Sequence, residues 1–354
     1  MRAKPKTGRR FLHLLAIAAP LFAFILLFRH NSTAAEWYMR KIYPLPANIL
    51  SFVSSLFPFS LFDLSIAVAL VLFLVAILLS IMGRMRWPVF FFHLSRFVVV
   101  TLCWFYFGWG VAYFRENYHT RADVAKSSFN SEDFSAFVMA FIAQANASYV
   151  DVNNLDRRAV VKEIEARYGQ LSDRLNLNYP NGRRRVKRMM FEPFQTKTGI
   201  SGYFGPFFNE VHVNEFVLDY SYPFTVAHEM AHQFGIASEA EANLYAFMVC
   251  SSGENPTIRY SAYYSVIGYL LNNVRTLLPD AYETIYQKVK PEIVNDLHES
   301  SRHWKDAAHK RMSEVQSKIY DGYLKSNRVH SGRKNYSEVV SLLVSAYNAG
   351  ALHF

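Results

Sequence analysis

Cysteine is nearly absent from this sequence, which contains only Cys103 and Cys250 among its 354 residues. Two cysteines cannot form a disulfide framework, so disulfide-stapled folds are excluded and the redox compartment is not readable from cysteine usage. Internal repeats and low-complexity tracts are lacking as well. Because 51% of the residues are hydrophobic, intrinsic disorder and collagen-like structure are also excluded. The length suits a membrane part followed by one globular domain.

Acidic residues are scarce in the first third of the chain, and this explains the overall net charge of +10. Residues 1–115 hold 12 Lys+Arg and 2 Asp+Glu, a net +10, whereas residues 116–354 hold 26 of each sign. The basic excess therefore belongs entirely to the apolar N-terminal part. A nucleic-acid-binding function, which the total charge suggests, loses its main support.

Long apolar runs predict three membrane-spanning helices, at about residues 11–28, 61–82 and 89–114. Runs of this length match the hydrocarbon core of a bilayer and exceed ordinary core helices. A basic segment precedes the first run and Ala34-Ala35 follows it, so a cleaved signal peptide is the alternative there. Its apolar stretch is longer than the roughly 7–15 residues usual for a signal peptide, which favours an uncleaved anchor.

The lysines and arginines of the short loops predict the orientation of these spans. They cluster at the N-terminus and between the second and third spans, as Arg2, Lys4, Lys6, Arg9, Arg10, Arg84 and Arg86. Arg29, Arg40 and Lys41 oppose this orientation but are spread over a longer loop. We therefore expect a cytoplasmic N-terminus, with residues 116–354 outside the bacterial cytoplasmic (inner) membrane. Residues 49–57 have apolar side chains at helical spacing, as in an interfacial helix on the outer leaflet.

Residues 116–354 predict one mostly helical domain. Apolar residues recur at helical spacing in residues 131–147, 157–175, 223–234, 239–250, 260–278, 279–289 and 291–324. Residues 186–214 are the exception, since they contain three glycines and end in an alternating, strand-like run at 209–214. The basic run at 183–188 is expected on the solvated surface, with contact to anionic lipid headgroups as the alternative.

The segment His228-Glu229-Met230-Ala231-His232 is an HExxH motif. On a helix, residues four apart share a face, so both imidazoles can reach one metal ion. Glu229 lies beside them and is expected to take a proton from a metal-bound water. The alternative, two histidines on an ordinary surface helix, is disfavoured because chance matches to this pattern are rare.

A catalytic zinc site needs a third protein ligand and keeps one position for water. Gly235 ends the motif helix, and Ser238 opens the next helix in a capping box with Glu241. Glu239 has no such capping role, so it is the expected third ligand, with Glu241 as the reserve. Asn243 lies four residues after Glu239 and either hydrogen-bonds a ligand or is an ordinary polar helix residue.

The run HEMAHQFGIASEAEAN at residues 228–243 resembles the gluzincin pattern, in which ExxAD or ExxAN follows HExxH on the next helix. Together with three spans and SGYFGPFFNEVHVN at 201–214, it resembles a bacterial domain-of-unknown-function family (family 3810) of membrane-anchored, zincin-like proteins. The resemblance covers nearly the whole chain, and its specific motifs occupy about residues 199–247. It implies that His228, His232 and Glu239 bind zinc and that Glu229 is the catalytic base. Asn243 stands where many gluzincins have aspartate.

The resemblance also implies the fold and the domains. We expect an α-helical membrane anchor over residues 1–115 and a mainly α, zincin-like α+β metallopeptidase domain over residues 116–354. Zincins place an edge strand beside the metal, to which an extended substrate can add. Residues 209–214 are the expected edge strand, with an interior strand as the alternative.

These observations predict a zinc metalloendopeptidase, with one Zn²⁺ per chain, that hydrolyses envelope proteins or peptides at the outer face of the membrane. Its expected partners are the lipid bilayer and a peptide or protein substrate. The alternatives are a zinc-dependent sensor or binding protein with little or no turnover, and a structural envelope protein. Five residues are candidates for stabilising the oxyanion: Tyr203, Arg259, Tyr263, Tyr264 and Tyr323. Three further histidines are expected on the surface: His298, His303 and His309.

Overall fold

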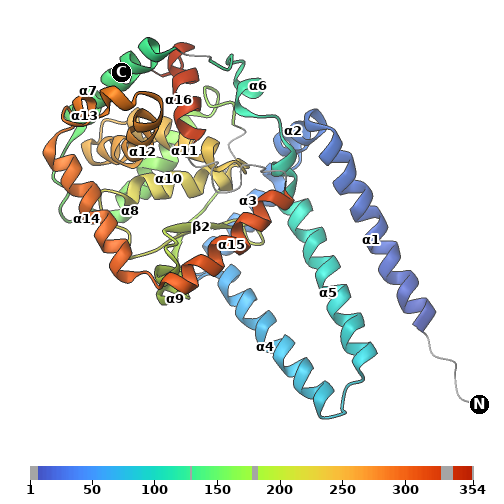
Figure 1. The fold of residues 1–354 in the computed structure, drawn as a ribbon. Helices are drawn as coiled ribbons and strands as arrows, with labels where there is room; N and C mark the ends of the chain where they lie inside the picture. Colours follow the sequence, from blue (N-terminus) through green and yellow to red (C-terminus); the bar gives the residue numbers. More distant parts are fainter. Residues whose placement is uncertain (1–6, 128–129, 178–181, 328–337, 353–354) are drawn as a thin grey trace, which may run out of the picture.

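Two long apolar helices, α4 (Leu61–Ile81) and α5 (Trp87–Gly108), project from the rest of the protein (Figure 1). The computed structural model describes residues 7–127, 130–177, 182–327 and 338–352. Within these residues, both helices are long and apolar enough to cross a membrane. A third span is counted if α1 (Thr7–His30) and α2 (Ser32–Lys41), which meet at a bend of 108°, are taken as one. The N-terminal basic residues Arg2, Lys4 and Lys6 lie outside the described residues.

The third predicted span ends earlier than the sequence suggested. α5 stops at Gly108, and Gly110–Phe114 forms the short 3-10 helix η1, which is mostly buried. Trp109 breaks the helix with φ −162° and ψ −32°. A Cβ on Gly110 would come within 2.7 Å of the Phe105 ring, so the glycine permits the chain to fold back against α5. The prediction of one helix up to residue 114 is therefore wrong at its C-terminal end.

Helix α3 (Pro44–Ser55) turns its apolar side away from the protein. Its buried residues are small, namely Ala47, Ser51, Ser54 and Ser55. Its large apolar side chains, Ile49, Phe52 and Val53, are 55%, 52% and 41% exposed. Small residues let α3 approach the protein closely, while its other face has the character of an interfacial helix.

The remaining structure is mainly α-helical, with one small sheet. Its helices are α6 (Tyr118–Ala122), α7 (Ser131–Ser148), α8 (Arg157–Leu171), α9 (Glu192–Thr198), α10 (Tyr222–Gln233), α11 (Glu239–Ser251), α12 (Pro256–Leu277), η2 (Pro279–Ala281), α13 (Tyr282–Tyr286), α14 (Pro291–Ala307), α15 (Lys310–Ser326) and α16 (Val339–Asn348). Side chains of Asn130, Asp156 and Asn255 accept hydrogen bonds from first-turn amides and fix the starts of α7, α8 and α12. The predicted helix at 291–324 is divided at Ala308, whose backbone is extended.

The sheet has the order β1-β3-β2, with strands β1 (Val186–Arg188), β2 (Gly202–Gly205) and β3 (Glu210–Val213). β1 pairs with β3 in parallel and β2 pairs with β3 antiparallel. The prediction that residues 209–214 form the edge strand is therefore wrong, because β3 is central. The parallel partner β1 comes from the basic run, where no strand was expected, and β1 and β2 are the two edge strands.

A buried ion pair joins the sheet to the start of α4. The Lys187 side chain pairs with Glu210, and both side chains are fully buried. Glu210 also accepts hydrogen bonds from the amides of Leu61 (3.1 Å) and Phe62 (2.9 Å), which are otherwise unpaired at a helix N-terminus. Burial alone would raise the pKa of Glu210, but its hydrogen bonds with His212 and Lys187 lower it below the ordinary value. The prediction that residues 183–188 lie on the solvated surface is therefore wrong for Lys187.

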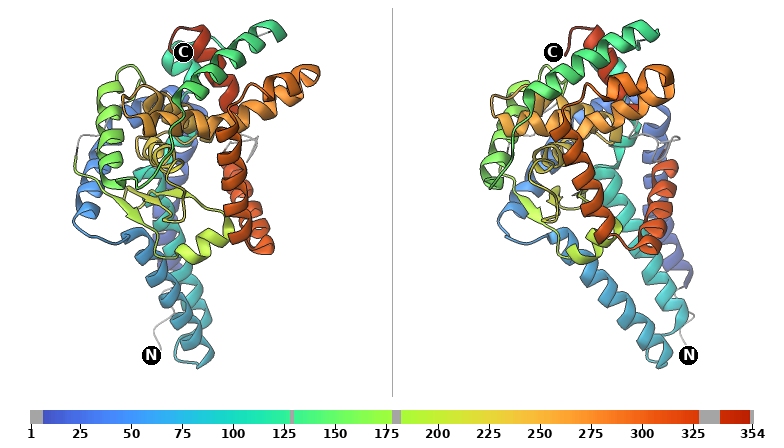
Figure 2. Two further views of the ribbon diagram at one scale, coloured as in Figure 1. Left: turned by 90° about the vertical axis from the view of Figure 1, so that its left-hand side faces the viewer. Right: turned by 60° about the vertical axis from the view of Figure 1, so that its left-hand side comes forward.

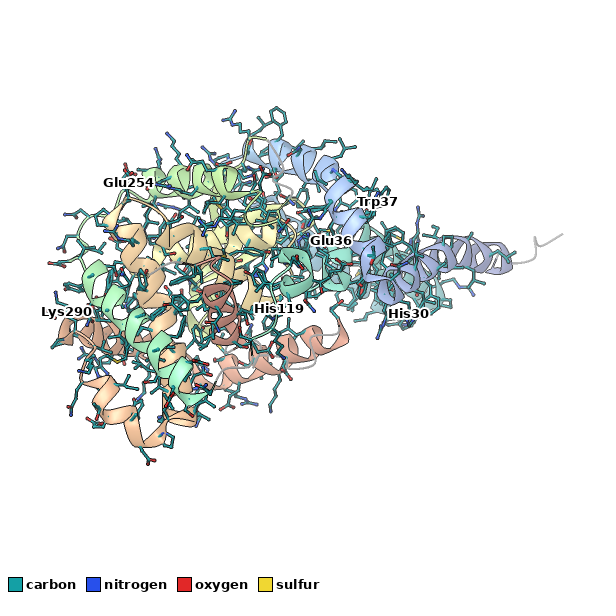
Figure 3. The ribbon with its side chains drawn as sticks, turned by 90° about the horizontal axis from the view of Figure 1, so that it is seen from above. His30, Glu36, Trp37, His119, Glu254 and Lys290 are labelled. Carbon is teal, nitrogen blue, oxygen red and sulfur yellow. The ribbon has the colours of Figure 1, made fainter. Side chains whose placement is uncertain are left out.

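The apolar N-terminal part and the globular part share a contact surface. Glu36 of α2 lies where the two parts meet (Figure 3), and it binds Arg115 at 2.8 Å. Ser51 of α3 donates to Asn209 Oδ1 at 2.7 Å, directly before β3. The division at residue 115 stays a prediction, and residues on its two sides contact one another closely.

Candidate metal centre

Two histidines and a glutamate from neighbouring helices converge in the interior. His228 and His232 lie four residues apart on one face of α10, and Glu239 is the first residue of α11. His228 Nε2 lies 3.1 Å from His232 Nε2 and 3.1 Å from Glu239 Oε2. One ligand atom from each residue lies within 4.8 Å of the others, so the group could hold a metal ion. Gly235, with φ +85°, permits the tight reversal that brings the two helices together.

The second ring nitrogen of each histidine contacts an oxygen. His228 Nδ1 lies 2.8 Å from Asn243 Oδ1, and His232 Nδ1 lies 2.6 Å from the Ile236 carbonyl oxygen. Both oxygens accept hydrogen bonds, so each Nδ1 donates to its partner and each Nε2 faces the common centre. Of the two interpretations of Asn243, the hydrogen bond to a candidate ligand is therefore confirmed.

Glu239 and Glu241 were the two candidates for the third metal ligand, and their positions in the structure differ. Glu239 is 4% exposed and faces both histidines, and Tyr320 of α15 donates a hydrogen bond to its Oε1. Glu241 points elsewhere, since its carboxylate binds Arg121 at 2.5 Å and the Tyr118 amide at 2.7 Å. The amide of Glu241 donates to Ser238 Oγ, as the capping box predicted. Only Glu239 of this pair is placed to share a metal with the histidines.

Glu229 lies beside the three candidate ligands and lines the same cleft. It packs so closely against Gly202 of β2 that a Cβ there would come within 2.7 Å of Glu229 Oε1. Burial raises the pKa of Glu229. Burial opposes ionisation of Glu239 too, but the two imidazoles hold its pKa well below the usual range. The two glutamates of the site therefore have opposite preferences for a proton.

A cleft of about 980 Å³ opens onto these groups. The segment 198–204, which includes most of β2, lines it together with Tyr264 and Tyr269 of α12. Gln316 and Tyr320 of α15 also line it. β2 pairs with β3 on one side and borders the cleft, so an edge strand lies beside the site as the resemblance to zincins implies, although it is a different strand from the one expected.

The five oxyanion candidates lie in different places. Tyr203 and Tyr264 line the cleft, but the Tyr203 hydroxyl donates to Asp63 of α4. Tyr263 packs in the core against Phe247, and Arg259 lies at the start of α12, outside the cleft. The side chain of Tyr323 lies outside the described part of the structure. Tyr320, one helical turn before Tyr323, was missed, because no spacing in the sequence indicates contact with Glu239.

Of the three histidines that were expected on the surface, His298 and His309 are exposed. His303 is half-buried. Its ring stacks on Phe216 at 3.7 Å between centroids, and its Nε2 lies 2.7 Å from the Phe216 carbonyl oxygen. The surface interpretation is therefore wrong for His303, which packs against the loop before α10.

The C-terminal end of α10 is held by residues of the apolar N-terminal part. Trp109 Nε1 donates to the His232 carbonyl at 2.8 Å, and the Tyr43 hydroxyl donates to the Gln233 carbonyl at 2.6 Å. Arg115 donates to the Gly235 carbonyl at 2.8 Å. Carbonyl groups at a helix C-terminus lack partners within the helix, so these donors fix the end of the helix that carries both histidines.

A family model described as "Protein of unknown function (DUF3810)" matches residues 38–344. This match includes α4, α5, the sheet and all the residues of the candidate metal centre. No curated protein and no solved structure is detectably similar to the chain.

Proposed function

The chain belongs to the DUF3810 family, and we propose from its metal-ligand geometry that it is a membrane-anchored zinc metalloendopeptidase. One observation carries this proposal. Two imidazoles and one carboxylate converge with both Nδ1 atoms already bonded to acceptors, which leaves the Nε2 atoms for a metal. Two histidines and a glutamate form the ligand set of catalytic zinc in thermolysin-like enzymes.

The residues fit a zinc ion in charge as well as in arrangement. Without a metal ion, a proton on one Nε2 would have to bridge the 3.1 Å contact between the two rings, and a zinc ion bound to both Nε2 atoms and to Glu239 would take the place of that proton. His228, His232 and Glu239 would hold the ion, and Asn243, Ile236 and Tyr320 would orient them through the hydrogen bonds described above. When bound, zinc supplies Lewis-acid polarisation of a carbonyl and a lowered pKa of its water.

The other groups of the cleft have roles that follow from their positions. Glu229 would accept the proton of the attacking water and pass it to the leaving amine, and its raised pKa suits a group that must hold a proton in between. An extended peptide would add to β2 by main-chain hydrogen bonds, as at other exposed sheet edges. The cleft volume of about 980 Å³ leaves room for a peptide segment beside the candidate ligands.

The proposal includes insertion of three helices into the bacterial inner membrane with a cytoplasmic N-terminus. In Figure 1 the start of α1 and the α4–α5 connection, which carries Arg84 and Arg86, lie on the side away from the globular part. Basic residues favour the cytoplasmic side, so the globular part would lie outside. Its substrates would be envelope proteins or peptides near that surface.

The test uses the full chain in lipid nanodiscs, with zinc content measured by elemental mass spectrometry and cleavage of a proteome-derived peptide library followed by mass spectrometry. Glu229→Gln should keep about one zinc per chain and lose cleavage by about 10²–10⁴-fold, the usual contribution of a general base. Glu254→Gln, the same change at an exposed glutamate, is the matched control and should behave as wild type. Equal cleavage by Glu229→Gln and wild type, or no zinc in the folded protein, would reject the proposal. Zinc without cleavage in wild type would favour the sensor or binding protein.

A further inference from the structure

Two surface elements of the globular part, α9 and α15, carry exposed large apolar side chains. Phe191 and Phe194, at the start of and within α9, are 41% and 55% exposed. Val315 and Ile319 of α15 are 53% and 70% exposed. The two elements form one unit, because they pack together and the His309 amide, directly before α15, donates to the Lys197 carbonyl at 2.8 Å.

This unit is tied to the ends of both projecting helices. The amide of Met190, just before α9, donates to the Asp63 carboxylate in the first turn of α4 at 2.8 Å. At the other end, Asn327, which follows α15, accepts from the hydroxyl of Tyr106 in the last turn of α5 at 3.2 Å. Figure 1 accordingly shows α15 running from α9 to α5, across the direction of α4 and α5, and Figure 2 shows α9 next to the start of α4 from two further sides.

The membrane boundary follows from the length of α4. Its 21 residues span about 31 Å at 1.5 Å per residue, which is the thickness of a bilayer hydrocarbon core. If α4 crosses the membrane, its first turn therefore lies at the outer boundary of the hydrocarbon. Met190, bonded to that turn, and α15, held between the two spans, must lie at the same level.

The exposed side chains have the composition of an interfacial surface. Between residues 310 and 319 of α15, the exposed positions are Lys310, Arg311, Glu314, Val315, Lys318 and Ile319. On α9, Lys197 is exposed together with Phe191 and Phe194. Apolar side chains mixed with an excess of basic ones suit the headgroup region. There the apolar side chains can insert toward the lipid acyl chains while the basic groups contact lipid phosphates.

We propose that α9 and α15 form a second membrane contact, seated in the outer headgroup region of the bilayer that α4 and α5 cross. The same two elements border the cleft, since Thr198, the last residue of α9, and Gln316 and Tyr320 of α15 line it. The cleft thus has one rim in the lipid interface. This inference rests on the proposed membrane insertion, though not on zinc or catalysis.

The experiment places single spin labels on the full chain in nanodiscs and compares their collisions with oxygen, which concentrates in lipid, and with a water-soluble nickel complex. A Cys103→Ala background is used, and Cys250 is fully buried. The test positions are Phe194→Cys and Ile319→Cys, with Val315→Cys as a substitute if either folds poorly. Glu254→Cys is the control, because Glu254 is exposed and lies on the globular part away from the projecting helices (Figure 3).

A label at Leu72→Cys, 62% exposed in the middle of α4, tests the insertion itself. We expect a severalfold higher oxygen-to-nickel collision ratio at residues 194 and 319 than at residue 254, with the highest ratio at residue 72. Water-like ratios at 194 and 319 with a lipid-like ratio at 72 would overturn the second contact and leave the proposed anchor intact. A water-like ratio at 72 would overturn both.

Discussion

Replacing Glu239 and Glu241 separately by glutamine tests which carboxylate completes the metal site. Glu239→Gln removes the carboxylate that, among the described residues, completes the candidate ligand group with His228 and His232, so zinc affinity should fall. Removing a residue that only hydrogen-bonds a metal ligand already lowers metal affinity about 10–100-fold. Removing the ligand itself should therefore lower zinc affinity at least about 100-fold, or about 2.7 kcal/mol. Zinc content after dialysis against a weak chelator should drop from about one per chain to near zero.

Glu241→Gln should affect stability and leave the metal in place. Its carboxylate partners Arg121, whose side chain is only 2% exposed, so the substitution leaves a buried guanidinium without its counter-ion. Breaking a buried pair from one side costs about 3–5 kcal/mol, and glutamine retains an acceptor oxygen, which favours the lower figure. At the roughly 2–4 °C per kcal/mol typical of domains of about 150–250 residues, a loss of about 3 kcal/mol corresponds to a Tm lower by at most roughly 6–12 °C in this longer chain.

The assay measures both quantities on the same full-length preparations, zinc per chain by elemental mass spectrometry and Tm by intrinsic fluorescence. Glu254→Gln is again the control, since it changes an exposed glutamate in the same way. The reasoning is refuted if Glu241→Gln loses zinc while Glu239→Gln retains it. Equal loss of zinc in both variants, with equal Tm, would also refute it.

Three further predictions concern neighbouring groups. Asn243→Ala removes the partner of His228 Nδ1 and should lower zinc affinity about 10–100-fold in a competition titration, whereas an unchanged affinity would deny Asn243 any orienting role. Glu210 has a lowered pKa in the folded state, so its stabilisation is fully present above its unfolded pKa of about 4.3 and declines as pH falls through the lower folded value. The difference in Tm between wild type and Glu210→Gln should therefore narrow on acidification below about pH 4, and a constant difference would contradict this. Tyr43→Phe removes the donor to the Gln233 carbonyl and should lower the free energy of unfolding by about 1 kcal/mol, measured by thermal or denaturant unfolding. A variant as stable as wild type would show that this contact contributes nothing.

The parts of the site that were predicted correctly are those that depend on neighbouring residues in the sequence. The spacing within HExxH places His228 and His232 on one helical face whatever surrounds them, and Ser238 marks the start of α11 by itself. The position of Glu239 followed by elimination. The true partner of Glu241 could not be predicted, because Arg121 is distant in sequence and reaches it only through packing.

The predictions that failed concern features that depend on contacts between segments distant in sequence. The alternation at 209–214 predicts a strand but not its neighbours, so β3 was placed at the edge although β1 pairs with it. Lys187 belongs to a basic run typical of surfaces, and only the sheet and the start of α4 reveal its burial beside Glu210. Tyr320 reaches Glu239 because α15 packs beside the cleft, which no periodicity in α15 specifies.

The three donors at the end of α10 have a consequence for any cut that separates the anchor from the rest of the chain. Tyr43 and Trp109 precede a cut near residue 115, and Arg115 lies at it, so the C-terminal fragment would lose the donors to the His232 and Gln233 carbonyls and weaken the third. At about 1 kcal/mol each, this is a sizeable share of the roughly 5–15 kcal/mol that keeps a protein folded. A fragment released by such a cut is therefore expected to be less stable than the full chain, because the end of the helix that carries both histidines loses these partners.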